Sequence, residues 1–507
     1  MDKTPNAVEQ KVPEAGIGIE KFLQGKAILI TGATGFLGKA IVEKILRTSQ
    51  NVSKIYLLIR ANDKKAAKQR LKTEVLEAEL FKCVKDKYGE GYEAFMMSKL
   101  VPVVGNVSQS DLGMEQDLAI AIKKNVHIII NSAAVTSFFP RYDDIIDINA
   151  MGPYNLMGFA KKCSKLELFL HLSTAYASLP RPGTIMEEML SMADITERDV
   201  YFNSNNKSLV RFLPAVMLEN EMKLIADCKK KYFVDPALAA KELSELGLQR
   251  ANKFGWPNTY TFVKAMGEMI IDSIREDVPV VIMRPALVEG TYNEPFPGWI
   301  EGFKGLDPLA ISNGQGKLTS FIGTLDVVLD VVPVDMVVNA SLAAMSIHGV
   351  TRKADINIYH IASSASHPLA LQDCFEVYFY EHFKMWPCVD ANGKPINVQK
   401  LKIITSMEEF DAHLLREATK SSSPSEMVER RKFMEKAKYM AKCYQPFTTY
   451  PYRFGMTNTE RLWECMSEDE KKKFGFDLKS IDWKDYIINV HIPGLRKHVM
   501  KEKCLSN

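Results

Sequence analysis

Short apolar runs alternate with amphipathic segments along the first part of the chain. The first run, residues 26–31, leads into a cluster of glycines, and residues 40–46 then repeat apolar side chains at helical spacing. A second run covers residues 54–60, and a charged segment of helical composition follows from residue 63 to about residue 87. The pattern predicts a strand, a helix, a second strand and a second helix.

β-Branched runs continue this alternation at residues 99–104, 126–131, 168–173 and 280–284. Most of them are separated by segments of helical character. Strands that alternate with helices form parallel sheets with helices on both faces. We therefore expect an α/β fold built on a Rossmann-like, doubly wound parallel sheet.

The same pattern divides the chain into parts. We expect a flexible tail at residues 1–17, a main domain at residues 18–400 and a smaller, mainly helical C-terminal domain at residues 401–507. Segments at about residues 179–256 and 289–328 interrupt the alternation, and the second contains the Pro- and Gly-rich sequence NEPFPGWIEG. We expect these two insertions to build the substrate side of the molecule.

Composition and charge exclude several classes of protein. Hydrophobic residues make up 46% of the 507 residues and charged residues 25%, as in ordinary globular proteins. The formal charge of +3 comes from dispersed side chains, so no basic face for nucleic acid is expected. The most apolar long stretch, residues 327–347, is interrupted by Asp330, Asp335 and Asn339, which excludes a membrane span but leaves room for peripheral membrane contact.

Cysteine and histidine spacing gives no sign of a metal centre. The eight cysteines form no CxxC pair, and the nine histidines form no HxxxH or HExxH motif. We therefore expect neither a metal site nor a disulfide framework, which favours a reducing compartment. The first residues include Asp2, Glu9 and Glu14 and lack an apolar stretch, so we expect no targeting segment and a protein that is not secreted.

The glycine cluster has the spacing GxxGxxG in ITGATGFLG, directly after a predicted strand and at the start of a predicted helix. Glycine permits a tight turn and close approach of the backbone to a pyrophosphate, while the helix N-terminus favours the anion. An ordinary glycine-rich turn is the alternative. The predicted dinucleotide-binding residues of this loop are Gly32, Thr34, Gly35, Phe36, Leu37 and Gly38.

Arg60 lies at the end of the second predicted strand. A site selective for NAD places Asp or Glu there, on the ribose 2′-hydroxyl, whereas this chain has Asp63 only beyond that point. Because an arginine suits a 2′-phosphate, we predict NADPH as the cofactor. The alternative is a solvated residue at a strand end, and Lys64 or Lys65 could share the phosphate.

Tyr260 and Lys264 are four residues apart in NTYTFVKAMGEMI, so on a helix both project from one face. A nearby ammonium would lower the pKa of the phenol, ordinarily about 10, and so suit a proton donor. Tyr380 and Lys384 have the same spacing. Chain order selects Tyr260, because it lies between two predicted sheet strands and Tyr380 lies beyond the nucleotide-binding part.

Thr174 closes an apolar strand in HLSTAYAS. Its hydroxyl could join Tyr260 in polarising a substrate carbonyl, and the adjacent Ser173 is an alternative. Threonines also often cap strands and turns without any catalytic role.

With these residues in place, the chain resembles the alcohol-forming fatty acyl reductases of the plant male-sterility type, which are extended short-chain reductases with an added helical C-terminal domain. The resemblance covers nearly the whole length. It is carried by GIGIEKFLQGKAILITGATGFLGK, KIYLLIRA, INSAAVTSFFPRYD, NLMGFAKKCSKLELFLHLSTAYAS, YTFVKAMGEM, EPFPGWIEG and DYIINVHIPGLRKHV.

The resemblance implies reduction of a long-chain acyl-CoA or acyl-carrier-protein thioester, through the aldehyde, to a primary alcohol with two NADPH. Such alcohols serve wax, suberin or pollen-wall sporopollenin synthesis. It makes Tyr260, Lys264 and Thr174 the catalytic group. It also implies further cofactor contacts: adenine between Asn106 and Val107, the ribose beside Ala133 and Ala134, and the nicotinamide near Pro285.

Relatives suggest a plastid location, with the endoplasmic reticulum or its cytosolic face as the alternative. Two rival functions use the same residues. One is an extended reductase for a steroid, sugar-nucleotide or phenolic substrate, against which the C-terminal domain argues. The other is a cofactor-binding protein without turnover, against which the intact catalytic trio argues.

Overall fold

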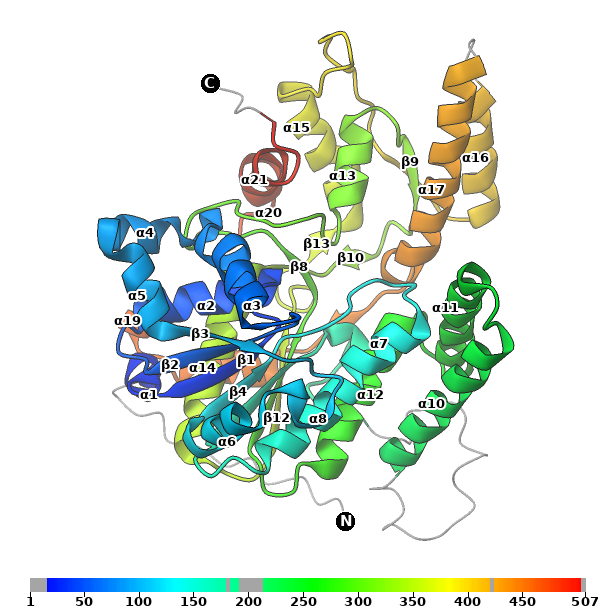
Figure 1. The fold of residues 1–507 in the computed structure, drawn as a ribbon. Coiled ribbons are helices and arrows are strands. Elements are labelled where there is room, and N and C mark those ends of the chain that lie inside the picture. Colours follow the sequence, from blue (N-terminus) through cyan, green and yellow to red (C-terminus); the bar gives the residue numbers. More distant parts are fainter. Residues whose placement is uncertain (1–15, 179–182, 191–212, 420–423, 503–507) are drawn as a thin grey trace, which may run out of the picture.

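The computed structural model describes residues 16–178, 183–190, 213–419 and 424–502 (Figure 1). Its centre is a seven-stranded parallel sheet with the order β12-β7-β5-β4-β1-β2-β3. The doubly wound fold predicted from the sequence is confirmed. The seven strands are β1 (Ala27–Thr31), β2 (Lys54–Ile59), β3 (Leu100–Val104), β4 (Ile128–Asn131), β5 (Leu168–Leu172), β7 (Val280–Pro285) and β12 (Ile356–Ile361).

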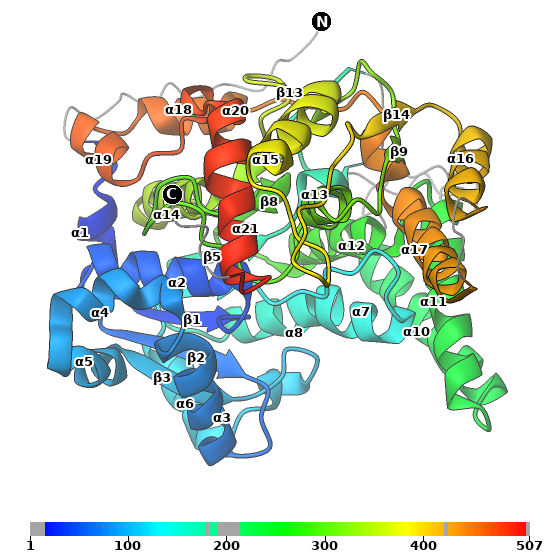
Figure 2. The same ribbon diagram turned by 90° about the horizontal axis from the view of Figure 1, so that it is seen from above.

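Helices cover both faces of this sheet. On one face α14 (Val334–Thr351) packs against α2 (Phe36–Thr48), and on the other α12 (Thr259–Ile274) packs against α8 (Met151–Ala160) (Figure 2). The strand order reverses between β1 and β4, and ligands of such folds bind at the carboxyl ends of the strands at this switch point.

Further helices surround the sheet and these four helices. They are α1 (Ile19–Leu23), α3 (Lys64–Leu71), α4 (Lys82–Tyr88), α5 (Tyr92–Lys99), α6 (Gln116–Asn125), α7 (Tyr142–Asn149), α10 (Leu213–Lys231), α11 (Pro236–Lys253), α13 (Asp307–Gly314), α15 (Phe379–Met385), α16 (Met407–Thr419), α17 (Pro424–Thr448), α18 (Thr457–Glu464), α19 (Glu468–Lys473), α20 (Trp483–Asp485) and α21 (Ile492–His498). Figure 1 shows α13, α15, α16, α17 and α21 together above the sheet.

Four short strand pairs tie later segments to earlier ones. The last part of the chain contributes two of them, since β14 pairs with β9 and β15 pairs with β6. The paired strands are β6 (Thr184–Ile185), β8 (Leu287–Glu289), β9 (Ser320–Ile322), β10 (Val328–Leu329), β11 (Val331–Pro333), β13 (Leu369–Ala370), β14 (Lys402–Ile404) and β15 (Arg453–Phe454). The helical C-terminal region is therefore connected to the main domain by backbone hydrogen bonds.

The long apolar stretch at residues 327–347 forms β10, β11 and most of α14. The acids that interrupt it accept backbone N–H groups, Asp335 from Tyr292 at 2.9 Å and Asp330 from Ser363 at 2.5 Å. None of the helices in the described ranges is both long and apolar enough to cross a membrane.

Most of the predicted N-terminal tail lies outside the described residues. At its end, the backbone N–H of Ile17 donates to the Glu470 carboxylate at 2.9 Å, and that of Gly18 at 2.6 Å. The start of the described chain is therefore held by α19.

Candidate active site

The glycine loop follows β1 and lies against the loop that follows β4. Gly32 has a φ of 69°, and a Cβ atom there would lie 2.7 Å from the backbone nitrogen of Ala133. A Cβ atom on Gly38 would lie 2.4 Å from the Gly32 carbonyl oxygen. Both positions therefore require glycine, because no side chain fits between these backbone segments.

The N-terminus of α2 opens directly from this loop. Gly35 is the N-cap residue, and its N–H donates to the Gly32 carbonyl at 3.0 Å. Backbone N–H groups at the start of a helix attract an anion. The first turn of α2 contains no acidic residue that would repel one. The loop residues predicted to hold a pyrophosphate lie at this helix start: Thr34, Gly35, Phe36 and Leu37.

A threonine hydroxyl joins the ends of β1 and β4. Thr31 Oγ1 accepts the backbone N–H groups of Ser132 at 3.2 Å and Ala133 at 3.1 Å, and donates to Asn131 Oδ1 at 2.9 Å. The predicted ribose neighbours, Ala133 and Ala134, thus begin a loop that is fixed beside the glycines. The analysis of the sequence did not single out Thr31, because a threonine at a strand end carries no motif.

Arg60 is exposed at the end of β2, and a second arginine approaches the same place. Arg70 Nη1 donates to the Arg60 carbonyl at 2.8 Å, and Arg70 Nη2 lies 3.4 Å from Thr34 Oγ1. A bidentate pair with Glu74, at 2.6 and 2.8 Å, orients the Arg70 guanidinium. Arg70 was missed in the sequence because it lies ten residues after the strand end, on the face of α3 toward the loop. Of the two lysines that were considered as further contacts of the 2′-phosphate, Lys64 pairs with Glu115 at 2.6 Å.

Asn106 and Val107 follow β3. The Asn106 side chain accepts the backbone N–H of Ser108 at 3.1 Å, and the Val107 carbonyl accepts from Asn155 Nδ2 at 3.0 Å. Both residues thus belong to a hydrogen-bonded turn, and their role toward adenine stays a prediction.

Tyr260 and Lys264 both lie on α12, as predicted. Asn258 caps this helix by accepting the backbone N–H of Thr261 at 2.9 Å. Lys264 is buried, with 3% exposure, and its Nζ donates to the Leu172 carbonyl at the end of β5 at 2.6 Å. The lysine is therefore fixed between the helix and the central sheet.

The pKa of Tyr260 moves in the direction opposite to our expectation. Burial raises the pKa of this phenol to about 12, while burial lowers the pKa of the Lys264 ammonium to about 8. One of the three ammonium N–H groups of Lys264 donates to the Leu172 carbonyl. Tyr260 is consequently a protonated phenol at neutral pH.

Thr174 closes β5 and caps the 3-10 turn η5 (Ala175–Ala177). Its hydroxyl donates to the Pro285 carbonyl at 3.3 Å and accepts the Tyr176 N–H at 3.4 Å. Thr174 and Pro285 are therefore brought together at the ends of adjacent strands. The neighbouring Ser173 hydroxyl is buried and has no hydrogen-bond partner among the described residues. The structure thus gives Thr174 a capping role, and the catalytic role of either hydroxyl stays a prediction.

A buried ion pair fixes the helix that carries Tyr260. Arg284 Nη2 of β7 lies 2.6 Å from Glu268 Oε2 of α12, and neither side chain is exposed. Glu268 is one helical turn beyond Lys264, and its negative charge raises the lysine pKa against the larger effect of burial. The pair therefore joins α12 to β7, and its carboxylate favours the charged form of Lys264.

We expect kcat/KM to decline on the alkaline side near pH 8, because the Lys264 ammonium loses its proton there. The substitution Glu268→Gln removes a charge that raises this pKa, so the decline should move to lower pH. It should also cost about 3–5 kcal/mol of stability, since Arg284 would be left buried without its counterion. A pH–rate profile and a denaturant melt measure both effects.

Glu276→Gln is the matched control, because this exposed carboxylate pairs with Lys161 at 2.8 Å. Its profile should match that of the unmodified protein. An alkaline limb that stays in place or moves upward in Glu268→Gln would contradict the assignment to Lys264.

Aromatic residues of the C-terminal region approach Tyr260 through Phe138. The Phe138 ring centroid lies 6.4 Å from that of Tyr260, 6.1 Å from that of Tyr444 and 5.4 Å from that of Phe447. Phe138 belongs to the loop after β4, whereas Tyr444 and Phe447 belong to α17. The C-terminal region therefore forms part of the site.

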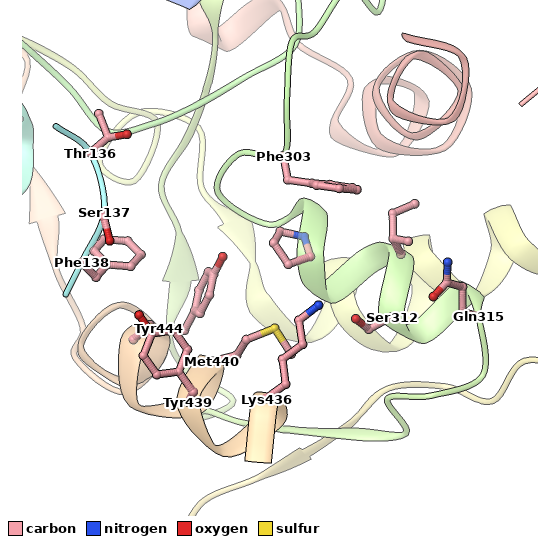
Figure 3. A pocket seen from close by; sticks show the side chains of 13 residues that line it. Thr136, Ser137, Phe138, Phe303, Ser312, Gln315, Lys436, Tyr439, Met440 and Tyr444 are labelled. Atoms are coloured by element: carbon pink, nitrogen blue, oxygen red, sulfur yellow. The ribbon is translucent and has the colours of Figure 1, made fainter. Parts of the chain in front are cut away.

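A cavity of about 500 Å³ lies beside this aromatic cluster (Figure 3). Figure 3 shows the loop with Phe138 along one side, and Ser312 of α13 with Gln315, which follows this helix, on the other. Most of the lining is apolar, while Lys436 contributes a cation. The lining residues are Thr136, Ser137, Phe138, Phe303, Pro308, Ile311, Ser312, Gln315, Lys436, Tyr439, Met440, Cys443 and Tyr444.

Comparison with known proteins assigns the chain to a family. Two family models, each described as male sterility protein, match residues 30–341 and 423–502. The chain belongs to the male sterility protein family. The curated relatives of this family include fatty acyl-CoA reductases, and the chain is accordingly an oxidoreductase with an NAD(P)-binding domain.

One relative, fatty acyl-CoA reductase 2, chloroplastic, of Arabidopsis thaliana, is 50% identical over 505 residues, which cover 96% of this chain and 80% of that protein. The alcohol-forming fatty acyl-CoA reductase of Simmondsia chinensis is 33% identical, over 95% of this chain and 99% of that protein. The terminal R domain of the myxalamid PKS-NRPS pathway shares the fold, with a TM-score of 0.56 at 16% identity, over 94% of this chain and 92% of that domain.

Proposed function

We propose that the chain reduces a long-chain fatty acyl thioester, carried by CoA or an acyl-carrier protein, through the aldehyde to a primary alcohol. The observation that carries the proposal is the contact of partly buried Tyr260 with Phe138, which also lines the apolar cavity. A proton donor beside an apolar chamber suits a carbonyl at the end of a hydrocarbon chain. The two curated relatives above bear names of fatty acyl-CoA reductases.

Two reductions account for the proposed product. In the first, thioester, NADPH and a proton give aldehyde, thiol and NADP⁺; in the second, aldehyde, NADPH and a proton give alcohol and NADP⁺. Bound NADPH supplies a hydride to the carbonyl carbon. The Tyr260 hydroxyl stabilises the developing oxyanion and gives its proton to the alkoxide, and the Lys264 charge lies one helical turn away.

NADPH is the proposed donor because two arginines meet at the end of β2. Arg70 contacts both the Arg60 carbonyl and Thr34 of the glycine loop, and two guanidinium groups this near the loop support a contact with a ribose 2′-phosphate. Arg70 reaches the loop itself through Thr34.

A covalent acyl-cysteine is not part of the proposal. Cys443 lines the cavity, and burial raises the pKa of its thiol to about 11. Burial likewise raises the pKa of Cys163 to about 12. Both thiols are therefore protonated at neutral pH and are poor nucleophiles.

We further propose that the enzyme works in plastids and contacts membranes peripherally while making alcohols for wax, suberin or pollen-wall lipids. The chloroplastic name of a relative that is 50% identical supports the compartment.

The turn between α10 and α11 supports the membrane contact, since Phe233 is 84% and Val234 is 91% exposed beside Lys230 and Lys231. Adjacent apolar and basic side chains suit an anionic lipid surface.

Replacing Phe233 and Val234 together with serine should weaken binding to anionic phospholipid vesicles about 100-fold, since each apolar side chain loses about 1.5 kcal/mol of burial. Vesicle co-sedimentation measures the loss. Val350→Ser, at another 63% exposed position, is the control. Equal binding by all three proteins would contradict membrane contact through this turn.

Filling the cavity should discriminate against long acyl chains. Met440→Trp places a larger ring among the lining residues, and we expect kcat/KM for C16 and C18 thioesters to fall about 10- to 100-fold, because each buried CH₂ contributes about 0.8 kcal/mol. Shorter thioesters should lose less. Met427→Trp, at a 37% exposed position of the same helix, is the control. An equal loss for every chain length would contradict an acyl-binding role.

The proposed function is tested by incubating the protein with NADPH and either a C16 to C18 acyl-CoA or the matching acyl-carrier protein, followed by product analysis. A long-chain alcohol is expected, and the better substrate identifies the carrier. Turnover of a steroid, sugar nucleotide or phenolic carbonyl, with no acyl thioester reduced, would overturn the proposal.

A further inference from the structure

Three buried side chains from distant parts of the chain converge where its C-terminal segment meets the main domain. Glu289 ends β8, Asp307 begins α13 and His491 ends the π-helical turn η9 (Tyr486–His491). Both acids have an exposure of 0% and the histidine 3%. One potential ligand atom from each residue lies within 4.8 Å of the other two.

The two carboxylates are oriented in the same way. Glu289 Oε1 accepts the backbone N–H of Leu306 at 2.8 Å, and Asp307 Oδ2 accepts that of Lys304 at 2.6 Å. Their other oxygens face His491 Nε2, with Asp307 Oδ1 at 2.8 Å and Glu289 Oε2 at 3.7 Å. Outer hydrogen bonds of this kind orient the ligands of metal ions in proteins.

Glu289 Oε2 has no hydrogen-bond partner among the described residues. A buried polar atom without a partner is costly, and two buried carboxylates beside one imidazole need compensating charge. Protons on Glu289 and His491 could supply it. The Glu289 proton would then point toward His491 Nε2, whose own hydrogen already donates to Asp307. A divalent cation neutralises both carboxylates and engages Oε2 directly.

We propose that Glu289, Asp307 and His491 bind one divalent transition-metal ion of the zinc class, which ties the C-terminal segment to the main domain. Bonds of about 2.0–2.2 Å in a tetrahedral site place ligand atoms about 3.3–3.6 Å apart, which lies between the two separations of 2.8 and 3.7 Å observed here. An imidazole combined with carboxylates suits zinc or manganese better than calcium or magnesium, which prefer oxygen ligands alone. The fourth position is left for water.

The site would stabilise one wall of the proposed acyl cavity. The Tyr444 hydroxyl donates to the Gly305 carbonyl at 2.5 Å, two residues before Asp307, and the Tyr444 ring lines the cavity. The Tyr486 hydroxyl donates to the Gly290 carbonyl at 2.7 Å, next to Glu289. Motif spacing could not reveal this cluster, because its members are far apart in the sequence.

Metal analysis of the full-length protein tests the proposal. The protein is dialysed against Zn²⁺ or Mn²⁺, freed of excess ion and analysed by mass spectrometry, and its Tm is recorded. We expect one ion per chain and a Tm that rises with ion concentration, both lost in Glu289→Gln. Glu79→Gln is the matched control, because Glu79 is a half-exposed partner of His498 at 3.0 Å. It should retain the ion.

Absence of stoichiometric metal from the unmodified protein after dialysis would overturn the proposal and favour the doubly protonated cluster. An ion retained by Glu289→Gln would overturn it as well. Should that variant fail to fold, X-ray absorption of the zinc-loaded unmodified protein decides. A shell of oxygen and nitrogen with one imidazole supports the site, and a sulfur shell or several imidazoles contradict it.

Discussion

Tyr260→Phe should lower kcat/KM for acyl thioester reduction about 10²- to 10⁴-fold, the range that a positioned proton donor contributes. The substitution removes only the hydroxyl, and the phenylalanine ring can keep the contact with Phe138 that Tyr260 makes at 6.4 Å. Folding and cofactor affinity should therefore change little. Steady-state rates, with a thermal melt and cofactor titration on the same samples, check the prediction.

The control is Tyr380→Phe. Tyr380 and Lys384 share the four-residue spacing, and on α15 the Lys384 Nζ lies 5.7 Å from the Tyr380 ring centroid. This variant should retain the rate of the unmodified protein. Loss of turnover in Tyr380→Phe with a normal rate in Tyr260→Phe would reverse the assignment.

Changing Arg60 and Arg70 together to serine should raise the KM for NADPH about 100-fold or more and leave the KM for NADH nearly unchanged. Each charge-assisted hydrogen bond to the 2′-phosphate contributes about 1.5–3 kcal/mol, and NADH has no phosphate there. Initial rates with each cofactor measure the ratio.

Lys64→Ser serves as the control, because Lys64 already pairs with Glu115 at 2.6 Å and its side chain is 79% exposed. It should have little effect on either KM. An equal rise in the KM for both cofactors in the double variant would mean that the arginines support the loop and do not read the phosphate.

The sheet was largely predictable because its strands are nearly continuous apolar runs. Six strands stand out from the sequence in this way, and β1 and β4 are buried at every position. The seventh, β12, has the sequence INIYHI, in which Asn357 and His360 break the run. Its place in the sheet depends on pairing with β7, which no local pattern reveals.

The glycine loop and the Tyr260 helix were predictable because each depends on local backbone geometry. Arg70 and the cavity were not, because they depend on contacts across the fold. Phe138 and Tyr444 are some 300 residues apart in sequence, yet their ring centroids lie 6.1 Å apart. The direction of the Tyr260 pKa also required the structure, since burial raises it and only the fold shows how the phenol is covered.

The most direct test of the account uses NADPH carrying deuterium at the transferable position of the nicotinamide, with a C16 acyl-CoA as substrate. If one site performs both reductions, mass spectrometry should find two deuterium atoms on C1 of the alcohol and two NADPH consumed per alcohol. Aldehyde with a single deuterium as the final product, or no reduction of the thioester, would contradict the account.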